Sequence, residues 1–405
     1  MVHSQQLFLG NTKTRFTDKI CAFCFAVAPI LQHYRGIYEN MGFTILLLTS
    51  PILLFRMIDE LQRDRIYVNN LKALIPFFLF EIYSVIVRDF SSTRIFYAIF
   101  FVWVYFCIAS GCLNIFYILK YAVTIGLLGT ILIIIQYISH YIFHHTIDFR
   151  MLNLLVSQDM IWIRHMDMNE GMIRLYRPAG LFLEPSHFFL YTFPLITLLL
   201  ISKSLRDIRK ASLLSIGMLL TTSGMGIVFL IGIWGIFLLV YRSSQDRVSL
   251  RNIATPRNIG YVLIFITAFA IMYATIPIIN QSITRIFYSE SGSNTAIDGR
   301  VMRAQNYIET ISGKDVWFGR AGITSELDFN LSGFYATYIK WGIIGLILTY
   351  WFYVQGLFKL KDAYFWLSII IVSISFFTAH THGTFYMLYF SLFLLNGYHQ
   401  KQIKN

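Results

Sequence analysis

The sequence predicts an all-α, polytopic integral membrane protein with about twelve transmembrane helices. Of its 405 residues 56% are hydrophobic and only 13% are charged, and the mean hydropathy is +0.60, outside the range of soluble globular proteins. Apolar runs long enough to cross a ~30 Å hydrocarbon core recur along nearly the whole chain. Little sequence is left for a soluble domain, so residues 1–405 are expected to form a single membrane domain, and no cleaved signal peptide is expected at the start.

The apolar runs place the expected spans in order along the chain. They lie near 19–34, 41–55, 71–88, 95–112, 118–143, 187–202, 211–222, 224–241, 259–279, 332–354, 364–379 and 383–398. The stretch "TTSGMG" interrupts one long apolar run between the seventh and eighth spans. Two interpretations of this interruption stay open, a tight turn between two helices and a break within one helix.

The orientation of the spans follows from the distribution of Lys and Arg, since cytoplasmic loops carry an excess of both. One set of loops holds 20 of the 33 cations and is therefore placed in the cytoplasm, with both termini inside: the N-terminus, 56–72, Lys120, 202–210, 241–258, 355–363 and the tail. This excess accounts for the net charge of +12 without any nucleic-acid partner. The two long hydrophilic loops, about 144–186 and 280–331, then lie outside.

The cations of the outer loops are almost all arginine, whereas Arg and Lys are equally frequent inside. They are Arg35, Arg88, Arg94, Arg150, Arg164, Arg174, Arg177, Arg285, Arg300, Arg303 and Arg320, with Lys314 as the exception. A guanidinium presents a fixed fork of donors that binds phosphate or carboxylate through two parallel hydrogen bonds. The plain alternative is that the excess of arginine arose by chance, or that these arginines form salt bridges with acidic residues of the outer loops. The functional interpretation is an anionic ligand on the outer face, with diphosphate as the favoured group.

The first outer loop ends in the stretch "RPAGLFLEPSHFF", where the sixth span begins. Pro185 suits the first turn of that helix, which places Glu184 and His187 at its outer end. A carboxylate there has an ordinary explanation as a helix cap. The alternative is a general base at the mouth of the membrane, with Arg164, Arg174 and Arg177 holding a leaving group.

The second outer loop is expected to contain a short amphipathic helix. Arg300 and Arg303 share one face of it, and the opposite stripe is apolar: Val301, Ala304 and Ile308. Residues 319–322, "GRAG", then predict a flexible turn whose backbone N–H groups, beside Arg320, approach an anion.

Two further positions, Lys340 and His382, are candidate site residues. Lys340 is expected about 13 Å along the tenth span, where an ionisable group marks a site, an ion partner or a cavity, unless it snorkels to the interface. His382 flanks a short outer turn and is a possible base. No metal or cofactor site is expected, since no group of His, Cys or acidic residues has suitable spacing, and the four cysteines lie within apolar runs.

Three blocks occur in order over about 174–350: "RPAGLFLEPSHFF", "LTTSGMGIVFLIGIWGIFLLVY" and "DGR…WFGRAG…GFYATYIKWGIIGLIL". Together with the topology they resemble the Wzy-type polymerases of bacterial O-antigen, capsule and exopolysaccharide, in the group that includes the O-antigen ligases. The resemblance implies a bacterial inner-membrane glycosyltransferase with its site facing the periplasm. Its substrates would be undecaprenyl-diphosphate-linked oligosaccharides, and a chain-length regulator is a further partner left open.

The resemblance implies that a hydroxyl of one lipid-linked repeat unit attacks the anomeric carbon of another, with inversion, and that undecaprenyl diphosphate leaves. In the absence of an expected metal, the outer arginines would stabilise the diphosphate. Functional arginines of the family's two loops correspond here to Arg164, Arg174 and Arg177, and to Arg300, Arg303 and Arg320. Glu184 is the first choice as general base, ahead of His187 and His382.

The sequence departs from the family's pattern at two positions, and one other class of protein remains a rival interpretation. The ligases carry a histidine at the end of the second outer loop, where this sequence has Leu331, and the family's arginine in the serine–glycine break is absent after Ser223. The first departure makes a ligase the weaker alternative. A lipid-linked oligosaccharide flippase is the rival from another class, but transporters of that kind usually show paired halves and short outer loops.

Overall fold

The computed structural model describes most of the apolar chain and parts of its loops. The described residues are 15–37, 40–61, 68–87, 92–109, 112–149, 176–202, 204–221, 223–241, 260, 267, 270, 273–275, 280, 304–305, 307–320, 333–360, 362–377 and 389–395. The structure is 86% helix, with no strand in the part of the chain that it describes. The prediction of an all-α fold is confirmed.

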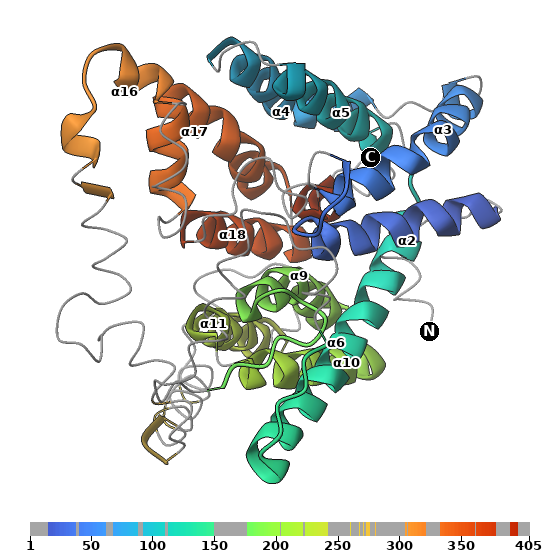
Figure 1. Ribbon diagram of the computed structural model, residues 1–405, viewed down its shortest axis with the longest axis vertical. Coiled ribbons are helices and arrows are strands. Elements are labelled where there is room, and N and C mark those ends of the chain that lie inside the picture. The colour runs from blue at the N-terminus through green and yellow to red at the C-terminus, as the bar shows by residue number, and fades with distance from the viewer. Residues whose placement is uncertain are drawn as a thin grey trace. The chain divides into compact units, whose positions relative to one another are not determined.

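The helices follow the expected spans closely (Figure 1). Their bounds are α2 Phe16–Leu31, α3 Met41–Leu61, α4 Val68–Val87, α5 Ser92–Ala109, α6 Ile115–Phe143, α9 Pro185–Ile201, α10 Leu205–Leu220, α11 Gly224–Tyr241, α16 Lys314–Phe318, α17 Gly333–Lys359 and α18 Asp362–Phe377. Each expected span overlaps one of them except 259–279 and 383–398, which fall largely outside the described residues. The segments Met41–Asp59, Ile115–Phe143 and Gly333–Lys359 are long and apolar enough to cross a membrane, and α5, α9, α11 and α18 contain shorter apolar helices.

The interruption at "TTSGMG" is a tight turn between two helices. α10 ends at Leu220 and α11 begins at Gly224. The indole Nε1 of Trp234 in α11 donates a hydrogen bond across 2.9 Å to the Ser215 hydroxyl in α10. The two residues lie on opposite sides of the turn, several residues from it, so the helices run antiparallel. Of the two interpretations left open, the hairpin is the one observed.

The chain divides into two compact units, each assembled from separate stretches. Unit 1 contains Met1–Leu7, Phe23–Leu48 and Phe116–Glu290, and unit 2 contains Phe8–Ala22, Thr49–Ile115 and Ser291–Asn405. Helices α2 and α3 therefore each contribute one part to unit 1 and another to unit 2. Whether the units act as one membrane domain, as expected, stays a prediction.

Helix α9 forms the core of unit 1. Its side chains from His187 to Leu200 are buried, and it packs against α10 and α11 (Figure 1). Glycines let α6 and α10 approach it closely, since a Cβ on Gly129 or Gly217 would lie 3.1–3.2 Å from atoms of the Phe188 ring. The bulky first turns of α9 are thus held by small residues on its neighbours.

In unit 2, α17 packs against α4, α16 and α18, and α4 packs against α5. The ring of Phe77 in α4 stacks on Tyr105 of α5 with centroids 4.9 Å apart and lies 4.7 Å from the ring of Phe352 in α17. These rings are fully buried or nearly so, which makes this aromatic layer the centre of the α4–α5–α17 packing.

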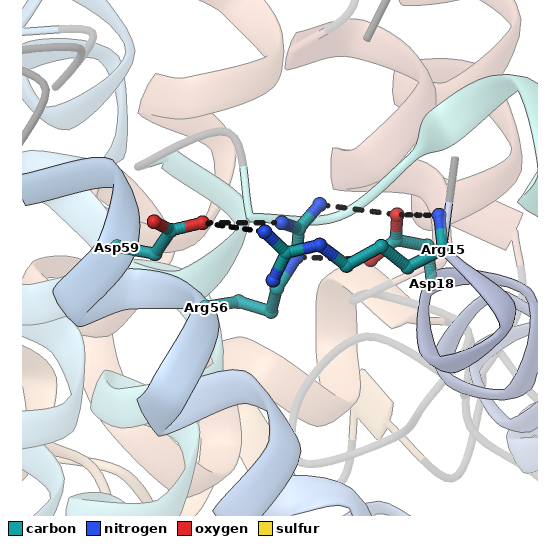
Figure 2. Close-up of polar contacts among 4 residues, drawn as sticks. All are labelled: Arg15, Asp18, Arg56 and Asp59. Atoms are coloured by element: carbon teal, nitrogen blue, oxygen red, sulfur yellow. Dashed lines mark hydrogen bonds and ion pairs between the residues drawn. The ribbon is translucent and has the colours of Figure 1, made fainter. Parts of the chain in front are cut away.

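A cluster of two arginines and two aspartates joins the start of α2 to the end of α3 (Figure 2). The Arg56 guanidinium pairs with both carboxylate oxygens of Asp18, Nε to Oδ1 at 2.9 Å and Nη2 to Oδ2 at 3.0 Å. Asp18 also accepts the backbone N–H of Arg15 at 2.9 Å, as an acid in the first turn of a helix does. Asp59 lies 3.5 Å from both guanidinium groups at the more exposed edge.

Candidate functional site

Three helix ends meet in unit 1 at the start of α9. We call the segment 176–187, together with the side chains of His33, Gln136 and His140 that contact it, the α9 junction. It brings together the C-terminal ends of α2 and α6 and the N-terminal end of α9. The predicted alternation of these three spans would place all three ends on the outer side of the membrane, and that placement stays a prediction.

Gly180 fixes the path of the chain through the α9 junction. Its φ of 62° lies in the left-handed region that favours glycine, and its backbone N–H donates across 2.8 Å to Oε1 of the buried Gln136. A Cβ here would lie 2.9 Å from the carbonyl oxygen of Gly129. The Nε2 group of Gln136 in turn donates to the Ile147 carbonyl at 3.0 Å. One buried amide therefore ties both ends of the first outer loop to α6.

Arg177 lies between two anchored positions. The ring of Tyr176 stacks on the imidazole of His140 with centroids 4.1 Å apart, and Ala179 is buried on the other side. The Arg177 side chain is half-buried and makes contacts of its own within the protein. Its backbone thus has little freedom, which suits a guanidinium that must meet a ligand in one geometry.

The carboxylate of Glu184 does not cap α9. Pro185 occupies the first turn, as predicted, and Glu184 is the residue at the helix boundary, with extended φ and ψ of −134° and 154°. Its backbone carbonyl accepts the N–H of His187 at 3.0 Å, but its side chain makes no capping hydrogen bond. Instead Oε2 accepts from the Ser186 hydroxyl at 2.9 Å. The ordinary explanation of this acid as a side-chain cap is therefore not what the structure shows.

His187 is buried, with 2% of its surface exposed, and its ring stacks on that of His33. The two centroids are 4.5 Å apart and the planes differ by 10°. His33 belongs to the turn that follows α2 and is half-buried. Tyr191, one helical turn after His187, donates its hydroxyl to the Ala26 carbonyl of α2 at 2.8 Å. Both contacts hold the first turns of α9 against α2.

The turn at Arg320 differs from the expectation. Gly319 has a φ of 73°, and its N–H donates to the Asp315 carbonyl at 2.8 Å, while the Arg320 N–H donates to the Ile339 carbonyl at 2.8 Å. The Arg320 guanidinium binds Asp315 at 2.7 Å through Nε and the Thr310 carbonyl at 2.6 Å through Nη2. These two N–H groups are already satisfied by the protein. The predicted flexible anion-binding turn is wrong for Gly319 and Arg320, which instead pack tightly against α17.

Lys340 lies in the first part of α17, seven residues after the helix begins at Gly333. Gly342, with φ of 64° and ψ of −166°, interrupts α17 two residues after Lys340. A Cβ on Gly342 would overlap the Trp317 carbonyl, which shows how closely 317–319 packs on the break. The Tyr83 hydroxyl of α4 donates to the Trp341 carbonyl at 2.6 Å. Lys340 is half-buried beside this break and makes contacts within the protein.

The amphipathic helix of the second outer loop is seen in part. Residues 304–305 and 307–310 are helical, and Ala304 is fully buried against Ala336 and Ile339 of α17. Ala304 thus belongs to the buried stripe, as predicted. The remaining predicted site residues lie outside the described residues: Arg164, Arg174, Arg300, Arg303 and His382.

The described candidates accordingly fall into two groups, one in each unit. Arg177, Glu184 and His187 share the α9 junction in unit 1, whereas Arg320 and Lys340 flank the α17 break in unit 2. No protein-family model matches the chain, and no curated protein matches it either.

Sequence reasoning missed two members of the α9 junction, His33 and Gln136. Both are polar residues near the expected outer ends of apolar spans, and that position in the sequence could have identified them as candidates. A polar side chain at the membrane boundary needs a partner. The partners of His33 and Gln136 become known only from the way α2 and α6 pack against α9 and the segment before it.

Proposed function

We propose that the protein is a polysaccharide polymerase that joins undecaprenyl-diphosphate-linked oligosaccharide repeat units at the periplasmic face of the bacterial inner membrane. The observation that carries the proposal is the α9 junction, where Arg177 and Glu184 lie on one segment that the Gly180–Gln136 hydrogen bond holds in place. The Glu184 side chain makes no capping hydrogen bond to α9. The resemblance of that segment to the Wzy-type polymerases supplies the reaction.

In this proposal Glu184 acts as the general base and Arg177 binds the diphosphate of the donor. The acceptor hydroxyl gives its proton to the Glu184 carboxylate while its oxygen attacks the anomeric carbon of the donor sugar. The bond between that carbon and the diphosphate oxygen breaks with its electron pair, and undecaprenyl diphosphate leaves. A single displacement inverts the anomeric centre.

Arginine suits the leaving group because two parallel hydrogen bonds match adjacent phosphate oxygens and the charge persists at any physiological pH. Donors placed where charge develops stabilise the transition state more than the ground state. Arg164, Arg174, Arg300 and Arg303 are proposed as further diphosphate ligands. Arg320 is the weakest candidate, since its guanidinium already binds Asp315 and Thr310.

The proposal is tested by reconstituting the purified protein in vesicles with lipid-linked repeat units isolated from the host. A polymerase lengthens the glycan, which gel electrophoresis of the released saccharides detects. A flippase instead moves the units between leaflets without lengthening them, which a membrane-impermeant glycosidase detects. A ligase lengthens nothing unless a second acceptor lipid is supplied. Translocation without extension would replace the polymerase proposal with the transporter.

A further inference from the structure

We propose that Ser186 is a positioning residue for the general base and that its hydroxyl orients the Glu184 carboxylate toward the acceptor. This inference rests on the proposed function, in which Glu184 takes the proton of the acceptor hydroxyl. The observation behind it is a hydrogen bond of 2.9 Å, which the Ser186 hydroxyl donates to Oε2 of Glu184. A general base works best when a further group holds it in one orientation.

The backbone of Glu184 is fixed without any help from Ser186. A residue that precedes proline is restricted to extended conformations, and Glu184 before Pro185 has φ and ψ of −134° and 154°. Its carbonyl accepts the N–H of His187 at 3.0 Å and that of Phe188 at 3.4 Å. The Cα of Glu184 therefore has a defined place at the start of α9, and only the side chain is left to be oriented.

The side chain of Glu184 needs a partner to adopt one conformation. Glutamate is among the residues that lose the most rotamer freedom when they are held in place. The carboxylate makes no capping hydrogen bond, so the backbone of α9 does not hold it. Ser186 lies in the first turn of α9, directly after Pro185. Its hydroxyl is thus carried by helical backbone and holds one oxygen of an otherwise flexible carboxylate.

The hydrogen bond distinguishes the two carboxylate oxygens of Glu184. Oε2 accepts from Ser186, and in the part of the chain that the structure describes no other side chain donates to either oxygen. Both residues are half-buried, so each remains partly accessible. Oε1 is then the oxygen that takes the proton of the acceptor hydroxyl, while the Ser186 proton stays on its own oxygen.

The plain alternative is a structural role, in which the bond between Ser186 and Glu184 takes the place of a helix cap. The two roles differ in what the loss of the hydroxyl changes. A substitute cap stabilises the start of α9, so its removal lowers the melting temperature. A group that orients the base acts on the chemical step, so its removal lowers kcat and kcat/KM equally.

The first test compares Ser186→Ala with Ser186→Thr in the reconstituted polymerase. We expect Ser186→Ala to lower kcat on the order of 10-fold at an unchanged KM, the effect of one lost hydrogen bond to a charged group. Ser186→Thr keeps the hydroxyl and should recover most of the rate. Ser212→Ala is the matched control, since that hydroxyl donates to the Ile208 carbonyl within α10 at 3.0 Å, and it should leave kcat unchanged. A lower melting temperature of Ser186→Ala with a normal kcat would overturn the positioning role.

A double-mutant cycle shows whether Ser186 acts through Glu184. Ser186→Ala is combined with Glu184→Gln, and the residual chain extension is followed over longer times. Because Glu184→Gln has no base to orient, Ser186→Ala should cause no further loss in that background. The same loss of kcat in both backgrounds would show that Ser186 acts independently of Glu184 and would overturn the proposal.

A third measurement does not depend on polymerisation. Protein labelled with ¹³C in the carboxyl groups of its glutamate side chains is placed in nanodiscs, and the Glu184 signal is identified by its loss in Glu184→Gln. We expect Ser186→Ala to shift this signal, and Ser212→Ala to leave it in place. An unshifted signal in Ser186→Ala overturns the role of Ser186. A shifted signal together with a wild type that extends no chains overturns the polymerase proposal and leaves the contact between Ser186 and Glu184 standing.

Discussion

The backbone N–H of Gly180 donates a hydrogen bond to Oε1 of Gln136 across 2.8 Å. Three residues before this bond lies Arg177, and four residues after it lies Glu184. The bond therefore fixes, from a buried side chain of α6, the segment that carries both proposed functional groups. Because Gly180 has a φ of 62°, no other residue takes this path without strain.

Replacing Gly180 by Ala tests whether this path matters. The left-handed conformation alone costs about 1–2 kcal/mol for a residue with a Cβ, and the new methyl group would press on the Gly129 carbonyl. We expect a lower melting temperature and reduced chain extension. Gly232→Ala in α11 is the control, since a Cβ there meets nothing within 4 Å. Equal melting temperatures for the two variants would show that the segment adapts easily.

The cluster in Figure 2 predicts a strong dependence of stability on Asp18. Asp18→Asn keeps an acceptor for the Arg15 N–H but removes the closer carboxylate partner of the Arg56 guanidinium, whose side chain is 14% exposed, and leaves it only Asp59 at 3.5 Å. Breaking a buried pair in this way costs about 3–5 kcal/mol. Asp59→Asn removes the charge at the more exposed edge and should cost no more than about 1 kcal/mol. Thermal unfolding in detergent compares the two, and similar melting temperatures would contradict the assigned burial.

The contact between Tyr83 and Trp341 predicts local protection of the second outer loop. Tyr83→Phe keeps the ring but removes the 2.6 Å hydrogen bond to the Trp341 carbonyl, at a cost of about 1 kcal/mol. Because 317–320 packs on the α17 break, we expect faster amide exchange at Gly319 and Arg320, measured by hydrogen–deuterium exchange. Tyr338→Phe serves as the control. Exchange that is unaffected by Tyr83→Phe would mean that the glycine contacts suffice to hold the loop.

Glu184→Gln separates catalysis from folding. The carboxylate makes no capping hydrogen bond, so the amide should leave the melting temperature unchanged. Loss of a general base is expected to slow chain extension by about 100- to 10,000-fold. Both quantities are measured on the same purified protein. Extension at the wild-type rate would remove Glu184 as the base, and a large drop in stability would restore its interpretation as a structural residue.

The features that follow from local sequence were predictable. Pro185 specified the start of α9 to within one residue, because proline fits the first turn of a helix and few other places in one. Apolar runs likewise located α6 and α11. The hairpin at "TTSGMG" was one of two open interpretations, since a serine–glycine pair ends helices and also kinks them.

The features that depend on distant contacts were not predictable. The break at Gly342 lies within a predicted apolar span and is accompanied by the close approach of 317–319, which no local sequence pattern predicts. The same holds for Arg320, where outer location indicated an anion ligand but Asp315 and Thr310 bind the guanidinium. His33 and His187 are far apart in sequence, so their stack depends on how α2 pairs with α9.

The most direct test of the central claim is the rate of chain extension by Arg177→Lys in the reconstituted system. Lysine keeps the positive charge but loses the two-pronged geometry, so the variant should insert and fold normally. We predict that extension falls on the order of 100-fold, as when one donor to a developing negative charge is removed. Polymer of normal length made at the wild-type rate would contradict the assignment of the α9 junction as the diphosphate site.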